Sequence, residues 1–143
     1  MKTAEMGSAE QLATTIAVAL GQIGQTEDAA LVIGNDERGT PRQIAIATHG
    51  GLAIAVVDWE SKSHGRLPAP ELELSYTPWR EVRTVVGISV TAVGDPTVTL
   101  TVNTPATGDI VTKSPQGRSA RQPFDKMLSL VLERSTGRGA REA

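Results

Sequence analysis

The chain of 143 residues contains no cysteine. This absence excludes disulfide bonds, cysteine nucleophiles, iron–sulfur clusters and zinc sites built on thiolates. The sequence also lacks an apolar run near the ~20 residues that a transmembrane helix needs. It does not open with a basic segment followed by an apolar one, as a secretory signal does. We therefore expect a cytoplasmic protein without a transmembrane segment.

Aromatic residues are scarce, at 3% of the chain, and the whole set is Trp59, Tyr76, Trp79 and Phe124. A sheet that binds single-stranded nucleic acid stacks the bases on several aromatic side chains, which this chain can hardly supply. The hydrophobic fraction is 39%, so the core must consist mainly of Val, Ile, Leu and Ala. We expect one domain of ordinary size that does not bind nucleic acid.

Charge is unevenly distributed, although the formal net charge is only −2. Residues 1–112 carry 7 Lys and Arg against 13 Asp and Glu (−6), and residues 113–143 carry 7 against 3 (+4). Arg118 and Arg121 belong to the densest basic segment and are candidate phosphate ligands. The alternative is a solvated basic end, which we favour because the acidic body repels polyanions at short range.

Apolar residues at helical spacing predict a helix near the N-terminus, after a disordered segment of residues 1–7. Ser8 and Gln11 form a capping box, in which each side chain binds the backbone N–H of the other residue. One face then carries an apolar stripe, made of Leu12, Ile16, Leu20 and Ile23. Gly24 is the predicted end, because glycine adopts the left-handed conformation of helix ends without strain.

A second helix is predicted near the C-terminus. Pro123 fits the first helical position, where its missing N–H costs nothing. The apolar stripe that follows consists of Phe124, Met127, Leu128, Val131 and Leu132. Gly137 is the predicted end, and residues 137–143 are expected to form a flexible basic tail.

Seven short runs between the helices predict strands, because apolar residues gather or alternate in them and turn residues separate them. Such a series without intervening helices is typical of a largely antiparallel sheet. The clearest signal is a hairpin of residues 42–49 and 52–58 around Gly50-Gly51, since glycine supplies the positive φ of primed turns. We predict one α+β domain over residues 8–136, whose seven mostly antiparallel strands curl into a barrel or orthogonal sandwich, with an N-terminal helix and a C-terminal helix.

Seven antiparallel strands closed by an amphipathic helix resemble the layout of pleckstrin-homology-like domains. The string from Tyr76 to Val82, which reads Tyr-Thr-Pro-Trp-Arg-Glu-Val, is similar to the entry into the central strands of bacterial domains of that kind. The predicted terminal helix lacks the tryptophan of eukaryotic members. Residues 35–42 contain two acids beside two arginines, where phosphoinositide-binding members gather basic residues. The resemblance therefore implies a binding scaffold and no phosphoinositide site.

No constellation for catalysis or metal binding stands out. His49 and His64 are the only histidines, and neither belongs to a recognisable arrangement of nucleophile, base and orienting group. The spacing of Asp58, Glu60 and His64 matches no metal-site signature. No glycine-rich loop opens a helix as a phosphate cradle does. We expect no enzymatic activity, no cofactor and no metal.

We interpret the chain as a non-enzymatic protein-interaction module of the pleckstrin-like type. Trp59 is a candidate anchor, because large aromatic side chains at loop edges often bury in partners, and His64 and Arg66 share its loop. One alternative is a small-ligand-binding barrel or an enzyme, with its site near the 59–71 loop. Another is the helix–sheet–helix layout of bacterial secretion-chaperone-like domains, which also bind proteins. We expect a protein partner, and a homo-oligomer is compatible with the sequence.

Overall fold

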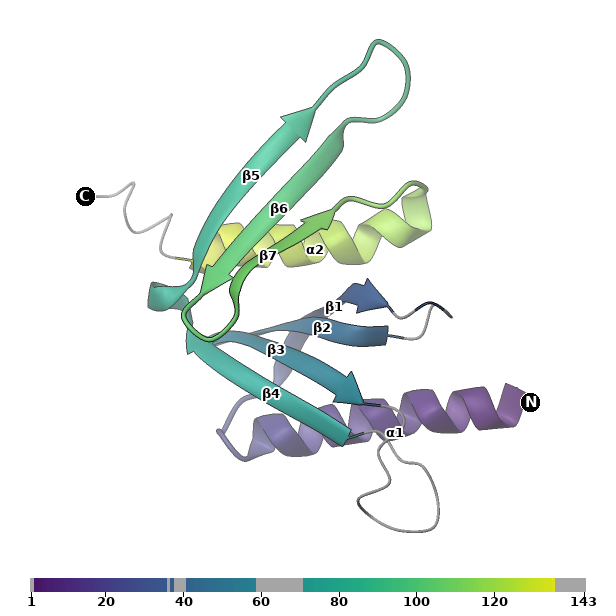
Figure 1. The fold of residues 1–143 in the computed structure, drawn as a ribbon, viewed down its shortest axis with the longest axis vertical. Coiled ribbons are helices and arrows are strands. Elements are labelled where there is room, and N and C mark those ends of the chain that lie inside the picture. Colours follow the sequence, from purple (N-terminus) through teal and green to yellow (C-terminus); the bar gives the residue numbers. More distant parts are fainter. Residues whose placement is uncertain (1, 36, 38–40, 59–70, 136–143) are drawn as a thin grey trace.

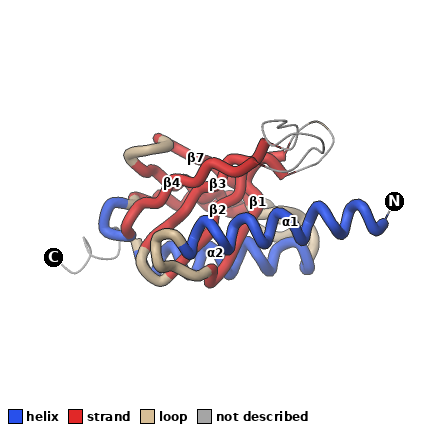
Figure 2. The backbone as a smooth tube through the Cα atoms, turned by 90° about the horizontal axis from the view of Figure 1, so that it is seen from below, coloured by secondary structure: helices blue, strands red, loops and turns tan. Residues whose placement is uncertain are grey.

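The computed structural model describes residues 2–35, 37, 41–58 and 71–135, and only the backbone of residues 2–9. These residues form a helix at each end, a short 3-10 helix and seven antiparallel strands (Figures 1 and 2), as the predicted α+β class requires. The elements are α1 (Lys2–Gly21), β1 (Glu27–Asn35), β2 (Pro41–Thr48), β3 (Gly51–Asp58), β4 (Glu71–Pro78), η1 (Trp79–Glu81), β5 (Arg83–Ser89), β6 (Thr97–Thr104), β7 (Gly108–Lys113) and α2 (Arg118–Arg134).

The described strands form two separate sheets instead of one closed barrel. A four-stranded sheet has the order β1-β2-β3-β4, and a three-stranded sheet has the order β5-β6-β7. Pro78 ends β4, and the 3-10 turn of η1 redirects the chain before β5 begins. Proline has no N–H to continue a ladder, so the sequence breaks the sheet between β4 and β5. Figure 1 shows the two sheets diverging from this corner.

The predicted hairpin is confirmed, but its turn lies one residue earlier. Ala47 is paired with Leu52, so the two-residue loop is His49-Gly50 and not Gly50-Gly51. Neither glycine has a positive φ, which contradicts the predicted primed turn. Close packing is the reason for Gly51: a Cβ there would lie 2.4 Å from the Thr77 carbonyl oxygen on β4.

The tip of this hairpin connects four other parts of the chain through two residues, Gly50 and the fully buried Thr48. The Thr48 carbonyl oxygen accepts hydrogen bonds from Trp79 Nε1 at 2.8 Å and from Arg134 Nη1 at 2.9 Å. The same Arg134 nitrogen donates to Asp28 Oδ2 at 2.7 Å. In the turn itself, the backbone N–H of Gly50 donates a hydrogen bond to Gln25 Oε1 at 3.0 Å. The hairpin tip thereby connects η1, the end of α2, the start of β1 and the linker after α1.

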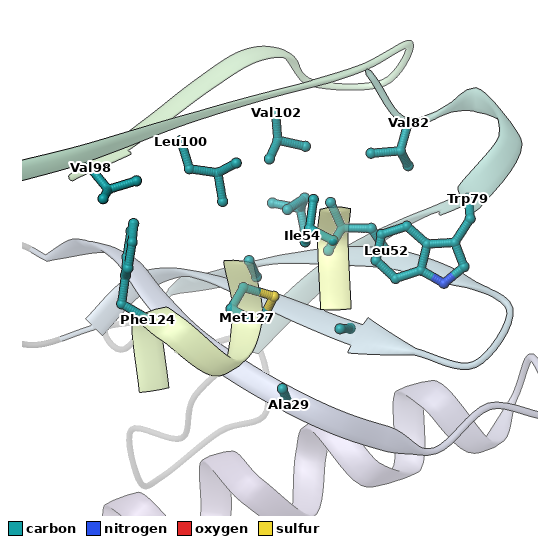
Figure 3. Packing of buried hydrophobic residues seen from close by; sticks show 13 residues of the cluster. Ala29, Leu52, Ile54, Trp79, Val82, Val98, Leu100, Val102, Phe124 and Met127 are labelled. Atoms are coloured by element: carbon teal, nitrogen blue, oxygen red, sulfur yellow. The ribbon is translucent and has the colours of Figure 1, made fainter. Parts of the chain in front are cut away.

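The first hydrophobic core lies between the two sheets (Figure 3). Phe124, Met127 and Val131 of α2 are each 1% exposed and fill it from one side. Leu52 and Ile54 face this core from the four-stranded sheet. Along β6 of the three-stranded sheet, buried and less buried residues alternate, so Val98, Leu100 and Val102 face the core from the opposite side. Of the predicted α2 stripe, Leu128 is partly buried against this core, whereas Leu132 is 43% exposed and faces solvent.

The second core lies on the other face of the four-stranded sheet, under α1. Leu12, Ile16 and Leu20 are buried there, as predicted. They share the core with residues of β2 and β3, namely Ile44, Ile46, Ala53, Ala55 and Val57. Because the four-stranded sheet is covered on both faces, its two central strands are buried almost throughout.

Helix α1 begins and ends earlier than predicted, at Lys2 and Gly21, although Gly24 is the terminating glycine as predicted. It starts at Lys2, so the backbone of residues 2–7, predicted to be disordered, is helical, and Ser8 lies inside the helix. The segment before Ser8 contains good helix formers, which the capping-box signal obscured. At the other end Gly24 has φ 68°, and Gln25 N donates to the Leu20 carbonyl at 3.0 Å. This is the glycine-terminated Schellman motif. It ends the helix before Ile23, which is exposed.

Helix α2 also begins earlier than predicted. Its first residue is Arg118, preceded by Gly117 with φ 94°, so Pro123 lies inside the helix and not at its start. A proline at this position removes the hydrogen bond to the carbonyl of Ser119, four residues before it, and its ring also crowds that carbonyl. The sequence predicts a flexible basic loop over residues 114–122, but residues 118–122 form the first part of α2. Ser114 is buried, and its Oγ accepts a hydrogen bond from Val98 N at 2.9 Å.

Replacing Phe124 should test the core between the sheets. We expect Phe124→Ala to lower the free energy of unfolding by about 3–5 kcal/mol, because it leaves a cavity where a ring was fully buried. Leu132→Ala on the same helix is the matched control and should change it by less than about 0.5 kcal/mol. Urea denaturation followed by circular dichroism measures both. Equal losses in the two variants would contradict this assignment of the helix faces.

A pair of glycine substitutions should separate close packing from backbone freedom. A Cβ on Gly51 would meet a backbone oxygen, whereas a Cβ on Gly87 would meet nothing nearer than Thr99 Cβ at 4.0 Å. Gly51→Ala should therefore destabilise the protein by about 1–3 kcal/mol. Gly87→Ala should be neutral or stabilise it by up to about 1 kcal/mol, because it restricts the unfolded chain. A thermal melt of both variants distinguishes the two effects, and tolerance of alanine at Gly51 would disprove the explanation.

Candidate functional site

The two open sheets have four edge strands, and three of them carry features that discourage pairing with another chain. The ladder between β1 and β2 has three irregularities. Strand β4 carries Glu71 and Glu73, and β7 carries Asp109 and Lys113. Bulges and charged side chains are the devices by which edge strands avoid edge-to-edge association.

Strand β5 has neither device along most of its length. Its ladder with β6 runs from Arg83 to Ser89 without a register shift. Arg83 at the start is its one charged residue, and residues 84–94 carry no charge. Strand β5 also contains no proline. Among the edges that the structure describes, β5 is therefore the one suited to accept an additional strand.

Exposed apolar side chains cluster along this edge and the turn after it. Val85 and Ile88 are both 67% exposed, Val90 is 70% exposed and Val93 is 85% exposed. We call these four residues the β5 surface. Val85 and Ile88 lie on β5, and Val90 and Val93 lie in the turn after it. Single exposed apolar residues are ordinary, but several along one nearly uncharged edge indicate a contact site.

The alternation in the sequence predicts a longer strand here, over residues 82–93, with Val82, Val86, Ile88 and Val90 on one face. Val82 is buried and Val86 partly buried, but the strand ends at Ser89, and Ile88 and Val90 are exposed. The reason is the projection of the β5–β6 hairpin beyond α2, seen in Figure 1. The apolar alternation continues past the end of the core.

The two basic candidates lie in the first turns of α2. Arg118 is exposed. Arg121 is held in place, because its Nη1 donates to the Pro96 carbonyl at 2.8 Å and its Nε lies 3.4 Å from Asp125 Oδ1. Arg121 therefore connects α2 to the β5–β6 turn, and its guanidinium is partly occupied by the protein itself.

The other candidates are Trp59, His64 and Arg66, and they lie outside the described residues. Asp58, the last residue of β3, is exposed. His49 is exposed in the hairpin turn. Within the described residues, no group of three or more His, Asp or Glu side chains is placed to hold a metal ion.

The space between the sheets leaves little room for a small ligand. A pocket of about 10 Å³ remains there, lined by Leu31, Ile33, Ala45, Leu52, Ile54, Leu100, Val102, Ile110, Thr112, Met127 and Val131. This is close to the volume that one water needs, whereas ligand sites usually hold about 300–1,000 Å³. The α2 side chains occupy the space that a ligand-binding barrel would keep open.

Val85 and Val93 were missed by reasoning from the sequence. The predicted strand was assigned one apolar face, which contains neither of these two valines. The signal that could have revealed them is the absence of charge from residues 84–94. Apolar content alone does not show which residues are buried. The sequence therefore did not reveal where along β5 the hydrophobic core ends.

Comparison with protein-family models, curated proteins and solved structures gave no match. In the part of the chain that the structure describes, no helix has both the length and the apolar character needed to cross a membrane.

The basic end can be tested for phosphate binding. We expect no micromolar binding of labelled duplex DNA at physiological salt, because the acidic body repels the polyanion. Arg121→Ala should instead lower the free energy of unfolding by about 1 kcal/mol, and Arg118→Ala should change it by less than about 0.5 kcal/mol. A fluorescence titration and urea denaturation measure these quantities. If the protein binds DNA with micromolar affinity and the variant with both Arg118→Ala and Arg121→Ala does not, these arginines are phosphate ligands.

Proposed function

We propose that this protein is a non-enzymatic protein-binding module of the pleckstrin-like type, which binds an extended segment of its partner as an additional strand along β5. The observation that carries the proposal is the contrast among the four edges. The other three are interrupted or charged, whereas β5 is regular, nearly uncharged and flanked by exposed apolar side chains.

Strand addition uses what an edge strand offers. Main-chain hydrogen bonds supply affinity, and side chains alternating between the two faces supply specificity. Register with β6 puts Val85 on the outer face of the sheet, opposite Thr101, and Ile88 on the inner face, opposite Val98. An added strand with apolar residues on both faces would contact both side chains.

The pleckstrin-like part of the proposal is supported by the order of the elements. Seven antiparallel strands precede an amphipathic helix whose apolar face packs on both sheets. The shared core also supports a sandwich of two sheets. The secretion-chaperone-like alternative agrees with the helices at both ends, and it too implies a protein partner. The cytoplasmic location stays a prediction.

The small-ligand alternative receives less support. The pocket between the sheets is about 10 Å³ and almost entirely apolar, so it offers neither volume nor orienting polar groups. A site formed by the 59–71 loop would depend on residues outside the described structure.

Selection from a library of linear peptides tests the proposal without knowledge of the partner. Peptides enriched on the full chain should be extended, uncharged and rich in β-branched residues. When bound, they should shift the backbone amide resonances of residues 83–89 more than those of β7. Val85→Lys with Ile88→Lys should weaken binding at least tenfold, about 1.4 kcal/mol.

Val111→Lys is the matched control, since Val111 is 56% exposed on β7, the other edge of the same sheet. Binding by this variant should remain within about twofold of the parent protein, because an exposed substitution alters stability little. Peptides that shift β7 in preference to β5, or that bind the lysine variant of β5 unchanged, would refute the proposal.

A further inference from the structure

The free edge of β5 offers its backbone hydrogen-bonding groups at every second residue. On the neighbouring strand β6, the Val98 carbonyl accepts a hydrogen bond from Ser114 N at 2.8 Å, and Val98 N donates to Ser114 Oγ at 2.9 Å. The backbone groups of Val98 therefore point toward β7, and those of the residues next to it along β6 point toward β5. With the register between β5 and β6, this leaves the N–H and C=O groups of Thr84, Val86 and Ile88 directed away from β6.

The residues between these three decide what an added strand meets on the outer face of the sheet. Arg83, Val85 and Gly87 lie on that face, in register with Asn103, Thr101 and Thr99 of β6. Because their backbone groups already bind β6, they would form the non-hydrogen-bonded pairs with an added antiparallel strand. Facing side chains lie closest together in such pairs, so these positions supply the specificity.

Arg83 brings an uncompensated positive charge to this edge. Its side chain is exposed and has no hydrogen-bond or ion-pair partner among the described residues. The acid in the same cross-strand row is Asp109 on β7, but Asn103 stands between them and donates from its Nδ2 to Asp109 Oδ1 at 2.7 Å. In the preceding η1, the charges of Arg80 and Glu81 cancel. Arg83 therefore sets the sign of the charge at this end of the edge.

Gly87 leaves the outer face open two residues further along. A Cβ there would meet nothing nearer than Thr99 Cβ at 4.0 Å. An aromatic side chain on a neighbouring strand can cover such an edge glycine. Between the two positions, Val85 offers a β-branched side chain, which pairs well with β-branched and aromatic residues across a ladder.

We propose that the partner segment runs antiparallel to β5 and carries an acidic side chain opposite Arg83. From its N-terminus, the segment would place an aromatic residue opposite Gly87, a β-branched residue opposite Val85 and then the acid, at alternate positions. Antiparallel pairing is favoured because it is slightly more stable per residue than parallel pairing. This inference rests on the proposed function, and it adds one charge to an otherwise uncharged segment.

Synthetic peptides test the acidic position. The probe is acetyl-Val-Tyr-Thr-Val-Thr-Glu-amide, whose blocked ends prevent a terminal carboxylate from replacing the side chain. Titration followed by the amide resonances of residues 83–89 gives both the affinity and the place of binding. The Glu peptide should bind about threefold more tightly than its Gln counterpart, as an opposite-charge pair across two strands does. This preference should disappear in 1 M salt, where the Debye length is about 3 Å. A peptide with the reversed order of residues should bind more weakly than the probe.

Charge reversal on the protein supplies the matched control. Arg83→Glu should weaken binding of the Glu peptide about tenfold, because an attractive pair becomes a repulsive one. The same variant should bind a peptide with Lys in place of Glu as tightly as the parent protein binds the Glu peptide. Lys113→Glu changes the net charge equally at an exposed position of β7, the other edge of this sheet. Binding of the Glu peptide by this control should stay within about twofold of the parent protein.

Several outcomes would overturn the inference while strand addition at β5 still holds. The Glu and Gln peptides could shift residues 83–89 with equal affinity, or the reversed peptide could bind more tightly than the probe. Arg83→Glu and Lys113→Glu could weaken binding equally, which would mean that only the overall charge matters. Peptides selected from the library could bind at β5 while the Glu peptide does not. If no peptide of either kind shifts β5, the proposed function fails and this inference fails with it.

Discussion

The carbonyl oxygen of Thr48 joins the tip of the β2–β3 hairpin to the turn between the sheets and to the end of α2. It is fully buried and accepts one hydrogen bond from the indole of Trp79 and one from the guanidinium of Arg134. A buried carbonyl without a partner costs about 1–3 kcal/mol, so the position of both donors is strongly favoured. Trp79 belongs to the turn between the sheets, and Arg134 ends the helix that packs on both. The hairpin tip therefore determines how η1 and α2 are placed.

A clear local sequence pattern did not always lead to a correct prediction of the structure. In the sequence, Val98, Leu100 and Val102 alternate with threonines and so predict a strand with one solvated face. The structure buries these three residues, because they face a core that spans β6. The two-glycine signal predicted a hairpin but misplaced its turn, since Gly51 is required by Thr77 on β4 and not by its own φ. A contact with a residue 26 positions later in the chain leaves no trace in a local pattern.

At the candidate site, too, a local sequence pattern did not reveal what depends on distant parts of the chain. Alternation over residues 82–93 predicted a strand there, but it could not show that the strand ends at Ser89 or that Ile88 and Val90 are exposed. The sequence also did not show which strands form the edges, because only the order of strands in the sheets distinguishes edge strands from central ones. The edges that discourage association could therefore not be identified. The capping box at Ser8 and the proline at Pro123 were sound local signals that lay inside longer helices.

The position of α2 at the end of the chain has a consequence for synthesis. Both sheets are meanders of sequence neighbours, so each can assemble early from short-range contacts. The core between them cannot close until Phe124, Met127 and Val131 have been made, because α2 supplies these side chains. Until α2 has been made, the inner faces of both sheets and the nearly uncharged β5 edge are therefore exposed on the nascent chain. Such transient exposure is what makes folding intermediates prone to aggregation and to capture by chaperones.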